Sequence, residues 1–271
     1  MILAGLNANG ATNIIEIDKS RDHTENMLLK NKKAIRIKKN KKNKNHIKIY
    51  GKELLNPQKI NVNGDPSSAA FFVALTLLIP KASLVIKNLG LNQRRIGFYE
   101  LLKKHGAKIN FKNRKKINNE FVGDVEVKYS KLKPLKAGPE YYVSATDEYP
   151  ILFVIAGLTK GMSIFKGIED LANKESNRIE EMKKILLQIG IKCMSKKNEI
   201  RIFGNPKIIT HKIIKVPPLG DHRICMSTTI LSLATGIKSR IKKFETVRTS
   251  APSFLKIIKS IGGSFEIKKS S

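Results

Sequence analysis

The sequence predicts an α/β protein that is built from repeated βαβαββ units. Three segments end alike, each with an amphipathic helix, a glycine and an alternating strand, and their glycines are Gly106, Gly190 and Gly262. Upstream of each glycine, an acidic turn opens an apolar helix, at Asp65, Asp147 or Asp221. The distance from aspartate to glycine is nearly constant, at 41, 43 and 41 residues. Unrelated segments would rarely share both ends and their spacing, so we interpret them as copies of one unit.

Each unit is expected to hold a short strand between its two helices. The candidate segments cover residues 83–87, 162–166 and 239–244. Two strands should follow the second helix, as at Asp124–Tyr129 and Glu199–Phe203, and one should precede the first helix, as at Lys59–Val62. Glycine after a helix adopts a left-handed conformation without a Cβ penalty, which makes it a stop signal. Such a unit cannot bury its sheet alone and must pack against its copies.

The start of the chain resembles a fourth, incomplete copy. Residues 2–10 are similar to the second half of the helix that opens at Asp147. We expect a strand at Asn13–Ile17, a helix at His23–Leu29 and a strand at Ala34–Ile37. The turn that should open the first helix has no counterpart, so the chain is expected to begin inside a helix. A short capping segment at a true terminus is the alternative.

The composition excludes several classes of protein. With 41% hydrophobic residues the chain is too apolar for a disordered protein, despite its net charge of +30. The longest apolar run, around Ala69–Leu75, is well short of the ~20 residues that a membrane helix needs. No basic segment follows Met1, which argues against a secretory signal. Cys193 and Cys225 form neither a disulfide framework nor a zinc spacing. We therefore expect a soluble, cytoplasmic protein.

The positive charge is spread over nearly the whole chain. Lysines often stand beside Asn and Ile, which indicates a compositional bias rather than a dedicated patch. The one dense run, Lys38–Lys44, is expected to be an exposed hairpin tip, and a nucleic-acid arm is the alternative. Aromatic residues make up only 6% of the chain and tryptophan is absent, so stacking surfaces are scarce. We expect salt-sensitive binding to DNA without sequence preference.

Charged residues near the predicted helix starts are candidates for anion binding. The first helices of the units should direct their N-termini to a common edge, where free N–H groups and dipoles attract anions. Asp65, Asp147 and Asp221 are expected to be N-caps there. Arg223 stands in the first turn of its helix, where a cation opposes the dipole, so a bound anion would explain its position.

A second cluster contains Lys174, Glu175 and Arg178 and precedes a helix that is expected from Ile179. Two cations four residues apart share a helix face, and an anion between them would offset their repulsion. Arg binds phosphate or carboxylate as a planar fork, whereas Lys acts as a point charge or proton donor. Asp147 would then serve as a base. A charged helix start with a capping interaction is the alternative.

Five segments resemble, in order, the motif series of 5-enolpyruvylshikimate-3-phosphate synthase, most closely the class II form that is common among bacteria. They are Ser20–Glu25, Gly64–Phe72, Asp147–Pro150, Lys174–Arg178 and Gly220–Met226. The resemblance covers essentially the whole chain and includes the βαβαββ units, so it implies the enolpyruvyl transferase fold, an inside-out α/β barrel. The related UDP-N-acetylglucosamine enolpyruvyl transferases share that fold, but their reactive-cysteine loop has no counterpart here.

The resemblance implies a transferase of the shikimate pathway, which leads to chorismate and the aromatic amino acids. The enolpyruvyl group of phosphoenolpyruvate moves to the 5-hydroxyl of shikimate 3-phosphate, and phosphate is released. The implied enzyme is cytoplasmic and, in its intact form, monomeric, and it needs no metal or organic cofactor. Its partners are these two small anionic substrates, with no membrane and no specific nucleic acid. Fixed cations and acid/base groups suit a reaction in which charge shifts through a tetrahedral intermediate.

Individual positions take their implied roles from the same motifs. Arg21 matches the residue that holds the shikimate phosphate, and Lys174 matches a lysine that contacts shikimate 3-phosphate. Asp147 matches the residue that contacts the shikimate hydroxyls and acts as the base toward the 5-hydroxyl. Glu175 matches a glutamate tied to proton transfer at the phosphoenolpyruvate methylene. The two arginines that clamp phosphoenolpyruvate match Arg178 and Arg223.

The sequence also departs from the family pattern. Asn177 stands where the family more often has Asp, and Ala172-Asn173 replaces a basic-apolar pair. The family's N-terminal Lys-Ser…Arg substrate site, its phosphoenolpyruvate loop and its Ser-Ala-Gln stretch have no counterpart. We expect residues 1–57 to be the last unit of the N-terminal domain and residues 58–271 to be the complete C-terminal domain of three units. Because the family's active site lies between two domains, this chain alone is expected to be inactive.

A protein of a different class is the alternative hypothesis. It would be a non-catalytic anion- or nucleic-acid-binding protein that retains the fold while its charge serves another partner. The intact set Asp147, Lys174, Glu175, Arg178 and Arg223 favours the enzyme, because drift would be expected to break at least one of these residues.

Overall fold

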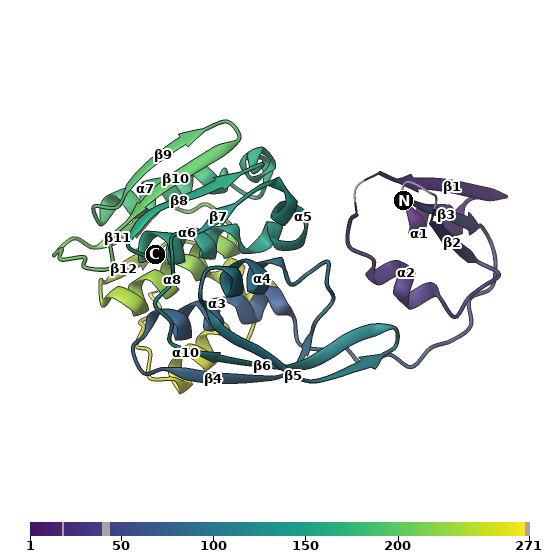
Figure 1. Ribbon diagram of the computed structural model, residues 1–271, viewed down its shortest axis with the longest axis horizontal. Helices are drawn as coiled ribbons and strands as arrows, with labels where there is room; N and C mark the ends of the chain where they lie inside the picture. The colour runs from purple at the N-terminus through teal and green to yellow at the C-terminus, as the bar shows by residue number, and fades with distance from the viewer. Residues whose placement is uncertain (18, 40–43, 269–271) are drawn as a thin grey trace.

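The chain folds into two lobes of unequal size in the computed structural model, which describes residues 1–17, 19–39 and 44–268 (Figure 1). The small lobe contains the described residues up to 50, drawn in purple, and the large lobe contains those from 66 onward. Residues 51–65 run between the lobes with little regular structure.

The small lobe is a three-stranded antiparallel sheet with two short helices. Its elements are α1 (Ile2–Asn7), β1 (Ala11–Glu16), α2 (His23–Leu28), β2 (Ile35–Lys39) and β3 (Asn45–Tyr50). The strand order is β1-β3-β2, and a small core forms around Leu28, Ile35, Ile47 and Ile49. The strands and the helix expected here are confirmed. β2 and β3 pair as the expected hairpin requires, while residues 40–43 of its tip lie outside the described residues.

The large lobe contains three successive units. The first comprises α3 (Pro66–Leu78), β4 (Ser83–Gly90), α4 (Gly97–Lys104), β5 (Lys108–Ile117) and β6 (Glu120–Lys128). The second comprises β7 (Lys136–Ala137), α5 (Tyr142–Ala145), α6 (Tyr149–Gly157), β8 (Gly161–Lys166), α7 (Arg178–Gln188), β9 (Lys192–Lys196) and β10 (Glu199–Gly204). The third comprises β11 (Ile214–Val216), α8 (His222–Thr235), β12 (Ser239–Ile241), α9 (Val247–Ser250) and α10 (Phe254–Ser260).

Three helices, one from each unit, form the centre of the large lobe. α3, α6 and α8 pack against one another, and α6 is buried along its whole length. A helix that is apolar on all sides suits such a position, because each of its faces meets protein. The sheets lie outside them in the orders β4-β6-β5, β7-β8-β10-β9 and β11-β12 (Figure 1). Helices inside and sheets outside are the inside-out arrangement that the family resemblance implies.

The predicted helix stops are also confirmed. Gly106, Gly190 and Gly262 have φ angles of +98°, +84° and +90°, in the left-handed region that favours glycine.

Two expected strands are wrong. Residues 59–62 form no strand, and Val62 is 91% exposed. Only an isolated bridge between Gly64 and Leu89 joins this part of the chain to a sheet. Residues 263–268, after the third helix stop, also form no strand. The alternating pattern is present in both segments, but β-structure needs a neighbouring strand to satisfy its backbone groups.

Candidate active site

The N-terminal ends of the three central helices meet at one end of the large lobe. Ser67, at the start of α3, lies close enough to Glu148, directly before α6, to lower the pKa of its carboxyl. The guanidinium of Arg223, at the start of α8, lies 4.0 Å from the carboxylate of Asp147. This end therefore concentrates free backbone N–H groups together with both signs of side-chain charge.

Two of the three expected N-caps are confirmed. Asp65 accepts a hydrogen bond from the backbone N–H of Ser68 at 2.8 Å. Asp221 accepts one from the backbone N–H of Arg223 at 2.9 Å. Both carboxylates satisfy donors that the first helical turn leaves unpaired.

Asp147 is not an N-cap, which corrects the third expectation. The cap position of α6 belongs to Glu148, and Asp147 lies in the preceding 3₁₀ turn. Pro150 occupies the second position of α6 and has no N–H to offer a capping side chain. The carboxylate of Asp147 instead accepts a hydrogen bond at 2.6 Å from Arg21 of the small lobe.

The electrostatic surroundings keep Asp147 acidic. Burial raises the pKa of its carboxyl, but the hydrogen bond from Arg21 and the charges of Arg223 and Arg21 outweigh that effect and lower the pKa below its usual value. Asp147 is therefore a carboxylate at neutral pH for as long as these cations stay close.

A hollow of about 400 Å³ opens beside this pair, between the two lobes. Its lining residues are Ser20, Arg21, Val143, Thr146, Asp147 and Lys174. The Nζ atom of Lys174 lies 2.7 Å from Asp170, and its side chain is 28% exposed. Three residues predicted for the shikimate phosphate and hydroxyls, Arg21, Asp147 and Lys174, thus face one space.

The interpretation of Lys174 and Arg178 as two cations on one helix face is wrong. α7 begins at Arg178, capped by Asn177, so Lys174 lies outside the helix. Arg178 is almost completely buried and donates hydrogen bonds to Asp221 at 2.9 Å and to Glu175 at 2.5 Å. Its charge is therefore matched by two carboxylates of the chain, and Asp221 joins the starts of α7 and α8.

Arg223 differs from Arg178 because it keeps unused hydrogen-bonding capacity. Its guanidinium lies over the Phe71 ring, 6.0 Å from the centroid, and its side chain is 13% exposed. The buried Nε atom has no hydrogen-bond partner. Buried donors are rarely left unpaired in proteins, so this arginine is suited to receive an anion.

Sequence reasoning missed the residues that hold the lobes together. Arg94, between β4 and α4, donates a hydrogen bond at 2.6 Å to the carbonyl of Ser20 and lies 3.1 Å from Asp22. Glu120, at the start of β6, contacts His23 at 2.9 Å and accepts a hydrogen bond from Asn26 at 3.0 Å. These contacts flank Arg21, so they position the small lobe against Asp147. The pair Arg94-Arg95 before α4 could have indicated a contact with acidic groups. The partners of Arg94 could not be identified from the sequence because they lie more than 70 residues away.

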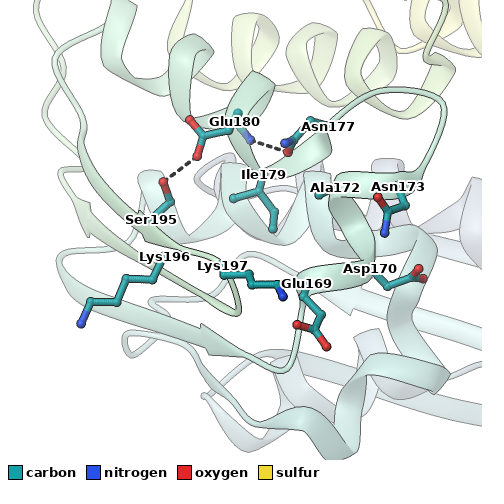
Figure 2. Close-up of a pocket in the computed structure, with 10 residues that line it drawn as sticks. All are labelled: Glu169, Asp170, Ala172, Asn173, Asn177, Ile179, Glu180, Ser195, Lys196 and Lys197. Atoms are coloured by element: carbon teal, nitrogen blue, oxygen red, sulfur yellow. Dashed lines mark hydrogen bonds between the residues drawn. The ribbon is translucent and has the colours of Figure 1, made fainter.

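A second hollow, of about 670 Å³, is lined by the segment before α7, the start of α7 and the β9–β10 turn (Figure 2). Hydrogen bonds join Glu180 to the side chains of Asn177 and Ser195 at its wall. The lining mixes acidic residues with Lys196 and Lys197 and includes none of the residues predicted for the substrates. It is therefore not the candidate site.

The described part of the chain offers neither a metal-binding cluster nor a membrane-spanning helix. No group of three or more His, Cys, Asp and Glu side chains is arranged to hold a metal ion there. None of the helices in that part is long and apolar enough to cross a membrane.

The chain resembles proteins of one family throughout. A family model described as EPSP synthase (3-phosphoshikimate 1-carboxyvinyltransferase) matches residues 1–258. A 3-phosphoshikimate 1-carboxyvinyltransferase of Zymomonas mobilis is 36% identical over 270 residues, which are 98% of this chain and 59% of that protein. One of Carboxydothermus hydrogenoformans is 38% identical over 94% of this chain and 58% of its own length. The chain thus spans about three fifths of the length of these relatives.

Solved structures agree with the sequence relatives. An EPSP synthase of Acinetobacter baumannii superposes with a TM-score of 0.85 at 33% identity, over 99% of this chain and 60% of that one. The enolpyruvyl transferase NikO of Streptomyces tendae has a TM-score of 0.75 at 13% identity, over 100% of this chain and 59% of its own, which shows a shared fold alone.

Proposed function

The chain belongs to the EPSP synthase family, and we propose that it forms one wall of a cleft for enolpyruvyl transfer. The group moves from phosphoenolpyruvate to the 5-hydroxyl of shikimate 3-phosphate. The hydroxyl oxygen forms the new bond to the enolpyruvyl carbon, the bond from that carbon to the phosphate oxygen breaks, and phosphate leaves. The observation that carries the proposal is the convergence of Arg21, Asp147 and Lys174 on one hollow.

Arg21 and Lys174 are suited to hold the phosphate of shikimate 3-phosphate by exchanging partners. Each is now paired with a carboxylate of the chain, Asp147 or Asp170, and each remains partly exposed. A bound phosphate offers more negative charge than a single carboxylate and accepts bidentate hydrogen bonds from arginine.

This exchange also prepares Asp147 to act as the base. When the substrate phosphate draws Arg21 away, Asp147 loses the hydrogen bond that contributes most to lowering its pKa. Burial then raises that pKa, and the carboxylate becomes a better acceptor for the proton of the 5-hydroxyl. Substrate binding and activation of the base are thereby the same event.

Phosphoenolpyruvate is assigned to the arginines at the starts of α7 and α8. Arg223 provides the first contact, because its buried Nε atom is unpartnered. Arg178 joins it when Glu175 gives up its hydrogen bond to that guanidinium. The released Glu175 carboxylate is then available for proton transfer at the methylene group.

The organisation of the whole enzyme follows the same proposal. Residues 1–57 take the place of the last unit of the N-terminal domain, and residues 58–271 take that of the C-terminal domain. We further propose a cytoplasmic monomer that needs no metal ion and recognises no specific nucleic acid. Both cysteines are unpaired and buried, which supports a reducing compartment.

The proposal is tested by phosphate release from shikimate 3-phosphate and phosphoenolpyruvate. The chain is assayed alone and with an added N-terminal domain from a related enzyme. Alone it should be at least 100-fold slower, because positioning of the substrates contributes about 7–11 kcal/mol in well-organised sites. With the added domain, Asp147→Asn should abolish turnover, whereas Asp124→Asn, at a half-buried position of β6 outside the hollow, should not change it. Equal rates for the two variants would contradict the assignment of Asp147.

A further inference from the structure

A second carboxyl lies buried next to Asp147. Glu148 occupies the cap position of α6, is 2% exposed and makes no capping hydrogen bond. Its Oε1 atom has no hydrogen-bond partner, and neither has the Nε atom of Arg223. The sequence motif does not distinguish this acid from its neighbour, and the proposed mechanism has not used it.

Polar and charged groups from several elements surround Glu148. Ser67 of α3 and the charge of Arg223 on α8 both act on its carboxyl and lower its pKa. Arg95, before α4, contributes a further positive charge and donates a hydrogen bond at 2.8 Å to the Ser67 hydroxyl. The negative charge of Asp147 also acts on Glu148. The charge of Glu148 in turn raises the pKa of the buried Tyr99 of α4.

The carboxyl of Glu148 is poised between its two charge states. Desolvation raises its pKa to about 7, and the charge of Asp147 adds to that effect, while Ser67, Arg223 and Arg95 oppose it. Among the described residues, no cation lies within 4.0 Å of this carboxylate as an ion-pair partner. Both the neutral and the ionised form are therefore populated near neutral pH.

We propose that Glu148 is a positioning residue for Arg223, a role that rests on the proposed function and deepens it. While neutral, the Glu148 carboxyl leaves the full charge of Arg223 to an anion in the cleft, such as phosphoenolpyruvate. When ionised, it attracts the guanidinium toward α6 and repels the bound anion. Binding of the anion therefore favours uptake of one proton by Glu148, and the affinity for the anion falls as that proton is lost.

The test is a calorimetric titration of the chain with phosphoenolpyruvate between pH 6 and pH 8.5. Wild type is compared with Glu148→Gln and with Glu100→Gln, a control at an exposed position of α4. The phosphoenolpyruvate phosphate titrates in this range for all three proteins, so the comparison between variants cancels its effect. Wild type and Glu100→Gln should lose about five- to tenfold more affinity than Glu148→Gln across this range. Glu148→Gln, which resembles the neutral acid, should bind like wild type at pH 6.

The outcomes separate this inference from the proposed function. Identical pH profiles for wild type and Glu148→Gln would overturn the role of Glu148 and leave the proposed function standing. No phosphoenolpyruvate binding by wild type at any pH would overturn both. Carbon-13 NMR of the glutamate carboxyls in the wild-type chain gives a second reading that does not depend on the folding of a variant. The titration midpoint of Glu148 should rise when phosphoenolpyruvate is added, and an unchanged midpoint would overturn the inference.

Discussion

The turns that open α8 and α6 occupy equivalent places in two copies of one unit, yet their aspartates behave differently. Asp221 is fully buried, caps α8 and forms an ion pair with Arg178. Asp147 caps nothing, lines a hollow and reaches Arg21 across the space between the lobes. The difference shows that equivalent positions of a repeat can diverge: Asp221 stabilises a helix start, whereas Asp147 caps nothing and leaves its carboxylate at the hollow, which supports the substrate role proposed for it.

The largest difference is expected when each aspartate is replaced by alanine. Asp221→Ala leaves the buried Arg178 without its main partner and removes a cap, so the free energy of unfolding should fall by about 3–5 kcal/mol. Asp147→Ala removes a partly exposed pair and should cost about 1 kcal/mol or less. Urea denaturation followed by circular dichroism measures both values. Equal losses of unfolding free energy for Asp221→Ala and Asp147→Ala would show that the two aspartates have the same structural role.

The start of α6 should also make the stability of the protein depend on pH. Glu148 holds the cap position there, and its pKa is raised from 4.5 to about 7 in the folded state. The folded state therefore binds more protons than the unfolded state between these values, and stability must fall as the pH rises through that window. The corresponding loss is about 3 kcal/mol.

Replacement of Glu148 isolates this contribution from the other carboxyls, several of which act in the opposite direction. Wild type should lose about 3 kcal/mol relative to Glu148→Gln between pH 4.5 and pH 7.5. Urea denaturation across that range checks the prediction. If the unfolding free energies of wild type and Glu148→Gln change equally with pH, the pKa of Glu148 is not raised by folding.

The smallest effect is expected at the third equivalent turn. Asp65 caps α3 and pairs with Arg95 at 2.8 Å, but its side chain is 45% exposed. Asp65→Ala should lower the free energy of unfolding by about 1–2 kcal/mol, mostly through loss of the cap. Glu53→Ala, at an exposed position between the lobes, is the control for loss of a surface carboxylate, and an equal effect of the two substitutions would remove capping as the cause.

Sequence patterns predicted the repeat, its helix stops and two caps because each depends on residues close together in the chain. Whether Asp147 caps α6 depends on Pro150 and on the second acid, Glu148. The sequence pattern alone does not tell which of the two acids occupies the cap position. The burial of Arg178 depends on Asp221, 43 residues away. The two wrong strands have the right alternation but no neighbour to pair with. Local chemistry was therefore predictable, and long-range pairing was not.

A calorimetric titration with shikimate 3-phosphate tests directly whether Arg21 and Asp147 face a site for that compound. Arg21→Ala should weaken binding by about tenfold or more, since a charge-assisted hydrogen bond contributes about 1.5–3 kcal/mol. Arg36→Ala removes an exposed arginine from the same lobe, where it lies over the Tyr50 ring, and should bind within twofold of wild type. Equal affinities for Arg21→Ala and Arg36→Ala, or no binding by the wild-type chain, would contradict the claim.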